Sequence, residues 1–102
     1  MTIASVKPLI SVIVPTYNRA SLIEEALNSV INQTYENFEL IVVDDGSTDD
    51  TAEKLEKFQS DQRFTLIRQE NQGQAAARNR GLEVAAGDYF CFLDSDNFWP
   101  SL

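Results

Sequence analysis

The chain has 102 residues, of which 43% are hydrophobic, and this size and composition fit one compact domain with a modest core. Its 16 acidic and 8 basic side chains give a net charge of −8, which argues against nucleic acid or an anionic membrane surface as a partner. The sequence has no histidine and a single cysteine, Cys91, which excludes a Ser-His-Asp triad and an internal disulfide.

The expected location of the chain follows from what its sequence lacks. Residues 1–7 contain neither a long apolar run nor a cluster of Lys and Arg, so they do not resemble a signal peptide. No apolar run approaches the roughly 18 residues that a membrane-spanning helix needs. We therefore expect a cytoplasmic protein, with the cytoplasmic face of the membrane as an alternative location.

Residues 9–14 are predicted to form the first strand, because they are rich in β-branched side chains. We expect Pro15 to end this strand, since proline cannot donate to the ladder of a central strand. A helix is predicted over residues 21–32, where apolar side chains recur at helical spacing. Ser21 and Glu24 have the spacing of a capping box and are expected to begin it.

The second predicted strand, residues 38–43, leads directly into two acidic residues, Asp44 and Asp45. After this turn, Ser47 or Thr48 is expected to cap the next helix, because serine and threonine hydroxyls accept from N–H groups at helix starts. The apolar face of that helix is expected to consist of Ala52, Leu55 and Phe58.

Residues 64–68 are predicted to form a third strand, shorter and more polar than the others, as is typical of a sheet edge. After Gly73 the chain then enters an alanine-rich helix. The small side chains of this helix allow close approach to the sheet. On this helix we expect Asn79 on the buried side with a hydrogen-bond partner. Gly87 is expected to end the helix in a left-handed conformation.

The apolar residues 89–93 are predicted to form a strand buried on both faces of a parallel sheet. The run ends in two carboxylates, Asp94 and Asp96, and ligands of open α/β sheets bind beyond the carboxyl ends of strands. Two carboxylates at this spacing can share one divalent cation, which predicts a metal and diphosphate site. The simpler interpretation of an isolated Asp-x-Asp is a surface loop.

Strands and helices alternate along the chain, which predicts a parallel sheet with right-handed crossovers. The carboxyl ends of all strands then share one rim, which gathers the loops after Val14, Val43 and Leu93. Each loop alone could be an ordinary turn, but their joint placement favours a binding site. Arg78, near the start of the alanine-rich helix, could point at a phosphate or face solvent.

Four segments together resemble one known family: residues 11–18, residues 39–49, residues 71–73 with residues 77–81, and residues 92–96. In order and spacing they are similar to the nucleotide-sugar half of family 2 glycosyltransferases of the GT-A fold, over residues 11–100. The resemblance implies an α/β, Rossmann-like domain with a parallel sheet of about four strands, in the order 3-2-1-4, and helices on both faces. We treat the whole chain as one domain that stops shortly after the Asp-x-Asp motif.

The resemblance also implies where a nucleotide binds. Pro15, Thr16 and Tyr17 would border the nucleoside base, with Tyr17 available for stacking. An acid of the Asp44 and Asp45 pair would accept a hydrogen bond from the base or ribose.

The same resemblance assigns the charged groups around the diphosphate. Arg78 would lie beside the nucleotide, Asp94 near the ribose or a metal-bound water, and Asp96 on a divalent ion. The ion would be Mn²⁺ or Mg²⁺, between which carboxylate oxygens do not discriminate. Many relatives carry a third acid directly after the motif, where this chain has Asn97.

The implied activity is metal-dependent transfer of a sugar from a nucleoside diphosphate sugar, with a UDP-sugar as the expected donor. The acceptor would be a saccharide or lipid-linked saccharide, and the full-length enzyme would invert the anomeric carbon. In the family, the general base lies beyond the metal motif, so no catalytic residue is assigned and residues 1–102 alone are expected to be inactive. A nucleotide-binding module that acts with a partner stays open as an alternative.

A different α/β protein with an acid cluster, such as a receiver domain or a phosphatase that uses an aspartate nucleophile, is a further alternative. A receiver domain is disfavoured, because it would need its acceptor aspartate after the third strand, where Arg68, Gln69 and Glu70 stand. A dinucleotide-dependent dehydrogenase would need a glycine-rich turn at residues 15–20, which contain no glycine.

The strand order 3-2-1-4 places the fourth strand at an edge of the sheet. Phe90, Cys91 and Phe92 would then be poorly protected, and Phe98 and Trp99 partly exposed. Because unpaired edges and apolar patches favour association, we expect the chain to self-associate through this edge.

Overall fold

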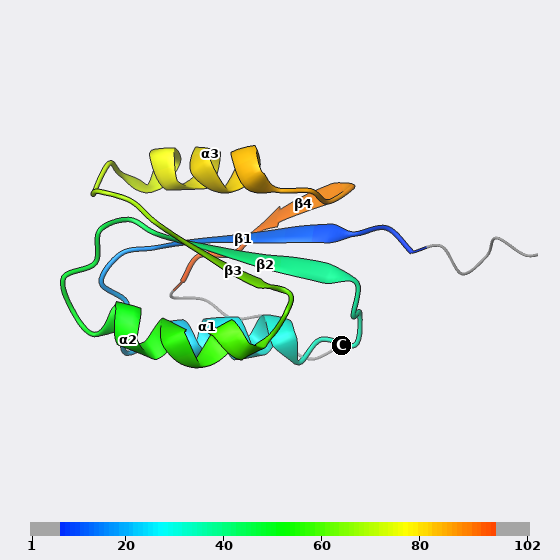
Figure 1. The fold of residues 1–102 in the computed structure, drawn as a ribbon, viewed down its shortest axis with the longest axis horizontal. Helices are drawn as coiled ribbons and strands as arrows, with labels where there is room; N and C mark the ends of the chain where they lie inside the picture. The colour runs from blue at the N-terminus through cyan, green and yellow to red at the C-terminus, as the bar shows by residue number, and fades with distance from the viewer. Residues whose placement is uncertain (1–6, 96–102) are drawn as a thin grey trace, which may run out of the picture.

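Four strands form one parallel sheet in the order β3-β2-β1-β4 in the computed structural model, which describes residues 7–95 (Figure 1). The strands are β1 (Ile10–Thr16), β2 (Phe38–Asp44), β3 (Phe64–Arg68) and β4 (Tyr89–Phe92). Both the predicted order and the parallel direction are confirmed.

Helices cover both faces of the sheet, as predicted (Figure 1). One face carries α1 (Ile23–Ile31), α2 (Thr51–Glu56) and the short 3-10 helix η1 (Lys57–Ser60), and the other carries α3 (Gln74–Val84). Alternate side chains of β1 and β2 fill the two cores: Val12, Val14, Leu40 and Val42 on the α1 side, and Ile13, Ile41 and Val43 on the α3 side. None of the helices in residues 7–95 is long and apolar enough to cross a membrane.

Strand β1 includes Pro15, so the expectation that this proline ends the strand was wrong. In a parallel ladder, successive residues bond to alternate neighbours. Ile13 faces β4, because its carbonyl accepts from Leu93, whereas Thr16 faces β2, because its carbonyl accepts from Asp45. Pro15 therefore faces the β4 side at a level beyond the last residue of β4, and its missing N–H costs the ladder nothing.

Strand β4 lies at an edge and is not buried on both faces, which corrects the interpretation of its apolar run. Tyr89, Phe90 and Phe92 are 62%, 51% and 45% exposed, and Cys91 is half-buried. Within residues 7–95, β4 pairs with β1 alone, so an apolar run does not by itself guarantee a covering neighbour. The predicted edge position is confirmed, while Phe98 and Trp99 lie outside the described residues.

The two predicted helix caps differ from what the structure contains. Helix α1 begins at Ile23 without a side-chain cap, so the capping box at Ser21 is absent. The backbone N–H of Ile23 instead donates to the carbonyl of Arg19, which continues a turn into the helix. Neither Ser47 nor Thr48 caps α2, because both contact Asn18 of the preceding loop.

Helix α3 rests on the sheet through Ala77 and Gly81, which lie one turn apart and are buried. Asn79 lies on the exposed side, so its predicted burial was wrong. A Cβ atom at Gly81 would lie 2.5 Å from Ile13 Cγ2, so the helix approaches β1 more closely than a larger side chain would allow. This close packing fixes the start of α3 relative to the carboxyl ends of the strands.

Gly87 is not left-handed, and α3 has already ended at Val84, which corrects the predicted role of this glycine. A Cβ atom at Gly87 would lie 2.4 Å from Ser11 Oγ and 2.7 Å from Ser11 N. The glycine is therefore required by the close approach of the segment before β4 to β1. Gly87 N donates to Ser11 Oγ at 2.8 Å, and Ser11 Oγ donates to Glu39 Oε2 at 2.5 Å.

Candidate functional site

A cavity of about 360 Å³ opens at the carboxyl ends of the strands, at the rim predicted from the sequence. Its lining includes the predicted residues Pro15, Thr16, Tyr17, Asp45 and Asp94. The structure adds Arg19, Asn71, Gly73, Gln74, Ala77 and Ser95. Loops that are far apart in the sequence therefore build a single site.

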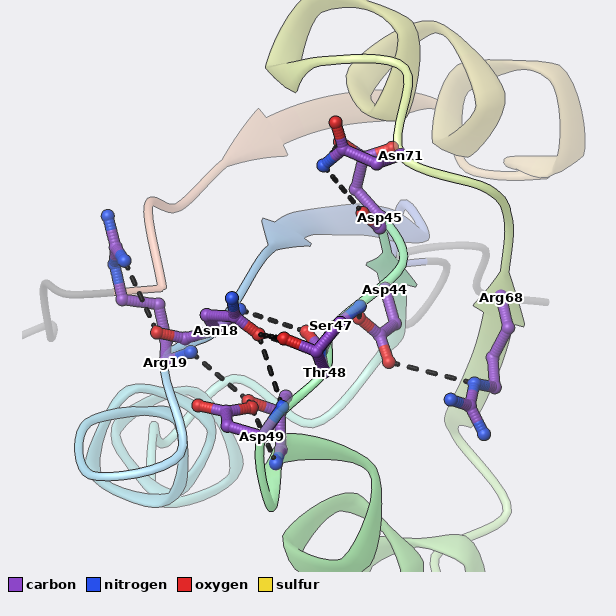
Figure 2. Close-up of polar contacts among 10 residues, drawn as sticks. Asn18, Arg19, Asp44, Asp45, Ser47, Thr48, Asp49, Arg68 and Asn71 are labelled. Atoms are coloured by element: carbon purple, nitrogen blue, oxygen red, sulfur yellow. Dashed lines mark hydrogen bonds and ion pairs between the residues drawn. The ribbon is translucent and has the colours of Figure 1, made fainter.

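The two neighbouring acids after β2 separate, and only Asp45 lines the cavity. Asp44 is the last residue of the strand and is fully buried, with Ser47 N donating to its Oδ1 at 3.0 Å. Its Oδ2 accepts no hydrogen bond within residues 7–95, and Arg68 Nε lies 3.6 Å away, at an ion-pair distance (Figure 2). Consecutive side chains point to opposite faces of a strand, which explains the separation.

Asp45 is 3% exposed and is surrounded by N–H groups of the loop between β3 and α3. Its Oδ1 accepts from Gln69 Nε2 and from Gln72 N, both at 2.8 Å. Its Oδ2 accepts from Gly73 N at 2.9 Å and from Asn71 Nδ2 at 3.3 Å. Asn71 Nδ2 also donates to the backbone carbonyl of Asp45 at 3.0 Å, and Figure 2 shows the two side chains together.

This environment sets the charge of the Asp45 carboxylate. Burial acts to raise its pKa, but hydrogen bonds from Gln69, Gln72 and Gly73 outweigh burial, and the pKa of Asp45 lies below its ordinary value. Asp45 is therefore ionised at neutral pH and anchors the loop that leads into α3. The sequence prediction did not include Gln69. It could have been found as a polar side chain directly after the edge strand β3, whose neighbour β2 ends in the acidic turn.

Asn18 joins the loop after β1 to the loop after β2 (Figure 2). Its backbone N donates to Ser47 Oγ at 2.9 Å, and its Oδ1 accepts from Thr48 N at 2.8 Å and from Asp49 N at 3.3 Å. Its φ of 50° lies in the left-handed region, which asparagine tolerates better than most residues. This clamp fixes the loop carrying Tyr17, and the sequence prediction gave Asn18 no role.

Asp49 secures the same region from the start of α2. Its Oδ1 accepts from Thr51 N at 3.0 Å and from Thr51 Oγ1 at 2.5 Å, and its Oδ2 accepts from Ala20 N at 3.3 Å. These bonds, led by the one from the Thr51 hydroxyl, hold the pKa of Asp49 below its ordinary value. Asp49 thus replaces Ser47 and Thr48 as the side chain that organises the start of the helix.

The start of α3 contacts Asp94 across the cavity. Gly73, with a φ of 100°, turns the chain into the helix, and its first residue, Gln74, donates from Nε2 to Asp94 Oδ1 at 3.1 Å. Arg78 Nη2 lies 3.5 Å from the same oxygen, and the Arg78 guanidinium carbon lies 6.0 Å from the centre of the Phe92 ring. Arg78 is thus held beside Asp94, one helical turn from the N-terminal end of α3. The N-terminal end of a helix favours anions.

The predicted metal site is only partly within the described residues. Asp94 lies in them and Asp96 lies outside them. Within residues 7–95, no group of three or more His, Cys, Asp or Glu side chains is arranged to hold a metal ion. Both bonds to Asp94 from Gln74 and Arg78 go to Oδ1, and Oδ2 accepts none from residues 7–95. Carboxylate oxygens are the ligands that Mg²⁺ and Mn²⁺ prefer.

The comparison with known families decides the classification. The family model described as Glycosyl transferase family 2 matches residues 11–101. The chain belongs to glycosyltransferase family 2. Its four-stranded sheet in the order 3-2-1-4 is that of the Rossmann-like GT-A fold found in its structural neighbours.

Curated relatives and solved structures agree with this membership. An uncharacterized glycosyltransferase of Haemophilus influenzae is 50% identical over 93 residues, which cover 89% of this chain and 37% of that protein. The glycosyltransferase GlyA of Streptococcus pneumoniae serotype 4 is 48% identical over 90 residues, which cover 87% of this chain and 13% of that protein. The chain spans between 13% and 38% of the length of the curated relatives it matches.

Two similar structures carry nucleotides. The crystal structure of S. aureus TarS in complex with UDP is 40% identical with a TM-score of 0.82, over 87% of this chain and 28% of that chain. The mannosyltransferase PcManGT from Pyrobaculum calidifontis, in complex with GDP-Man and Mn²⁺, is 37% identical with a TM-score of 0.86, over 94% of this chain and 30% of that chain.

Proposed function

We propose that this chain binds a nucleoside diphosphate sugar in the cavity at the rim of the sheet and forms the donor-binding part of a glycosyltransferase. The observation that carries the proposal is the convergence of Tyr17, Asp45 and Asp94 on one cavity beside the N-terminus of α3. The UDP complex of TarS and the GDP-Man complex of PcManGT support it, because both proteins share this fold.

The nucleoside would occupy the part of the cavity bordered by Pro15, Thr16 and Tyr17. Tyr17 is 42% exposed and has an aromatic ring on which a base can stack. The hydroxyl of Thr16 is buried and has no hydrogen-bond partner within residues 7–95, so it can still bond to a ligand or a water. Asp45 is the acid we assign to the base or ribose, because Asp44 does not line the cavity.

The diphosphate would lie between the start of α3 and the loop after β4. Arg78 supplies a positive charge beside Asp94, and the helix N-terminus supplies N–H donors. Asp94 and Asp96 would hold the divalent cation, Mn²⁺ or Mg²⁺. When bound, such an ion offsets the charge that develops on the departing diphosphate.

The reaction we propose is a displacement at the anomeric carbon of the donor sugar, with inversion. An acceptor hydroxyl forms the new bond as the bond to the diphosphate breaks, and a general base takes the hydroxyl proton. No residue of this chain is assigned as that base. The acceptor would be a saccharide or lipid-linked saccharide, and the reaction would take place in the cytoplasm or at the cytoplasmic membrane face.

Calorimetric titration of the full-length protein with UDP, in Mn²⁺ and in excess chelator, tests the proposal. We expect binding in Mn²⁺ and much weaker binding in chelator, because the carboxylates of Asp45 and Asp94 line the cavity and repel a diphosphate. Asp96→Ala should remove the difference between the two conditions. Equal affinities in Mn²⁺ and chelator for the unchanged protein would contradict the metal role, and no binding of any nucleoside diphosphate would contradict the function.

A further inference from the structure

Basic side chains are scarce in this chain, and most of them are paired with acids. The sequence has 8 Lys and Arg residues against 16 Asp and Glu residues, so each base has acids to choose from. Six of the eight lie at ion-pair distance from a carboxylate, and these are Lys54, Lys57, Arg63, Arg68, Arg78 and Arg80. Within residues 7–95, Lys7 and Arg19 have no such partner. Their positive charges are therefore not offset by a neighbouring acid of the described chain.

Arg19 is also the basic residue that lines the cavity, and it is the only one to do so in the described part of the chain. The two acids of the lining do not draw it away. Asp45 accepts four N–H groups from the loop between β3 and α3, and Asp94 is bonded to Gln74 and Arg78. The guanidinium of Arg19 is therefore the positive charge that this cavity offers directly to an anion.

The guanidinium of Arg19 is held by its own loop, with one edge left vacant. Its Nη1 donates to Tyr17 O at 3.2 Å and to Asn18 O at 3.3 Å (Figure 2), which accounts for both N–H groups of that nitrogen. The backbone N of Arg19 donates to Thr51 Oγ1 at 3.1 Å, which fixes the loop itself. The remaining N–H groups, on Nε and Nη2, have no acceptor within residues 7–95. That edge carries two parallel N–H groups, whose spacing matches two oxygens of one phosphate or carboxylate.

We propose that Arg19 binds an anionic group of the donor, with its Nε and Nη2 edge on two oxygens of a phosphate or of a sugar carboxylate. This inference rests on the proposed function and adds to it a second positive group, which comes from the loop after β1, whereas Arg78 comes from α3. A phosphate of the diphosphate and the carboxylate of a uronic acid sugar offer the same pair of oxygens. Arg19 is then a specificity-determining residue for the anionic part of the donor.

The test is calorimetric titration of the full-length protein and of Arg19→Gln, in Mn²⁺, with uridine, UDP, UDP-glucose and UDP-glucuronic acid. The substitution keeps an N–H donor for the loop carbonyls but removes the charge and the paired N–H groups. If Arg19 holds a phosphate, UDP and both UDP-sugars should bind about tenfold or more weakly to the variant, while uridine is unchanged. If it holds a sugar carboxylate, UDP-glucuronic acid alone should weaken. Guanosine, GDP, GDP-mannose and GDP-mannuronic acid replace the series if GDP binds and UDP does not.

Two further variants separate anion binding from other effects of the substitution. Arg19→Lys keeps the charge without the paired N–H groups, so it should lose less affinity than Arg19→Gln. Arg80→Gln is the matched control, since it removes the same charge from an exposed residue outside the cavity lining, and it should change no affinity.

Three results would overturn the inference while the proposed function stands. Arg19→Gln could leave every affinity unchanged, or Arg80→Gln could weaken the anionic ligands as much as Arg19→Gln does. Arg19→Gln could also weaken uridine as much as UDP, which would show that Arg19 only supports the loop that carries Tyr17. If no nucleoside diphosphate binds to the unchanged protein, the proposed function fails and this inference fails with it.

Discussion

The Asp45 carboxylate joins the acidic turn after β2 to the loop before α3. Gln69, Gln72 and Gly73 all donate to it, so the conformation of this loop depends on the negative charge of one side chain. The same loop positions Asn71 in the cavity and Gln74 against Asp94. A change at Asp45 should therefore affect both the stability of the fold and the shape of the site.

The first prediction is that Asp45→Asn lowers the free energy of unfolding by about 2 kcal/mol at neutral pH, because hydrogen bonds to a charged acceptor are lost. The pKa of Asp45 lies below its ordinary value of 3.8, so its contribution is present above pH 3.8 and is lost as the pH falls through the folded-state pKa. The difference in unfolding free energy between the unchanged protein and Asp45→Asn should therefore shrink as the pH falls below 3.8. Urea unfolding followed by circular dichroism, at several pH values, measures it, and a pH-independent difference would contradict the argument.

The residues after β2 show what the sequence could and could not predict about the site. Topology alone placed Asp44, Asp45 and Asp94 at the same rim, because parallel strands end together. It did not predict that Asp44 turns toward Arg68 and leaves the cavity to Asp45. That distinction depends on where β2 ends, and the strand extends one residue further than its apolar run.

At the scale of elements, the strands were predicted well, since a β-branched run specifies a strand without reference to its neighbours. The third strand matches its predicted range, residues 64–68. The errors concern features that depend on tertiary contacts. Pro15 stays in β1 because β4 ends before the position at which it would need an N–H from residue 15. Strand β4 is exposed because it has one neighbouring strand within residues 7–95.

The segment between α3 and β4 gives the second prediction. Gly87→Ala should lower the free energy of unfolding by about 1–3 kcal/mol, because the new Cβ would meet the backbone nitrogen of Ser11 and cannot be accommodated by a side-chain rotation. Chemical denaturation measures the change. Ala86→Ser adds one atom at the exposed neighbouring residue and should be nearly neutral. Equal stability of the Gly87→Ala and unchanged proteins would show that β4 is not held against β1 at this point.

At the scale of the molecule, the apolar side chains divide unevenly between the two faces of the sheet. The face covered by α1, α2 and η1 carries the larger core. On the opposite face, α3 contributes mainly Ala77 to the smaller core. At the edge of the sheet, β4 presents three exposed aromatic rings. Leu82 and Val84 of α3 are exposed as well. Within residues 7–95, β4 is therefore the element with the most exposed large apolar side chains.

The third prediction is that a polypeptide of residues 1–102 self-associates through β4. Strand β4 pairs with β1 along one edge, and within residues 7–95 no strand pairs with its other edge. Unpaired backbone groups next to exposed aromatic rings favour pairing with a second copy. Phe90→Lys should weaken the association, because a charge on an edge strand opposes pairing. Leu22→Lys, at an exposed apolar residue beside α1, should not weaken it. Light scattering across a range of concentrations distinguishes the cases, and a monodisperse monomer of the unchanged polypeptide would contradict the prediction.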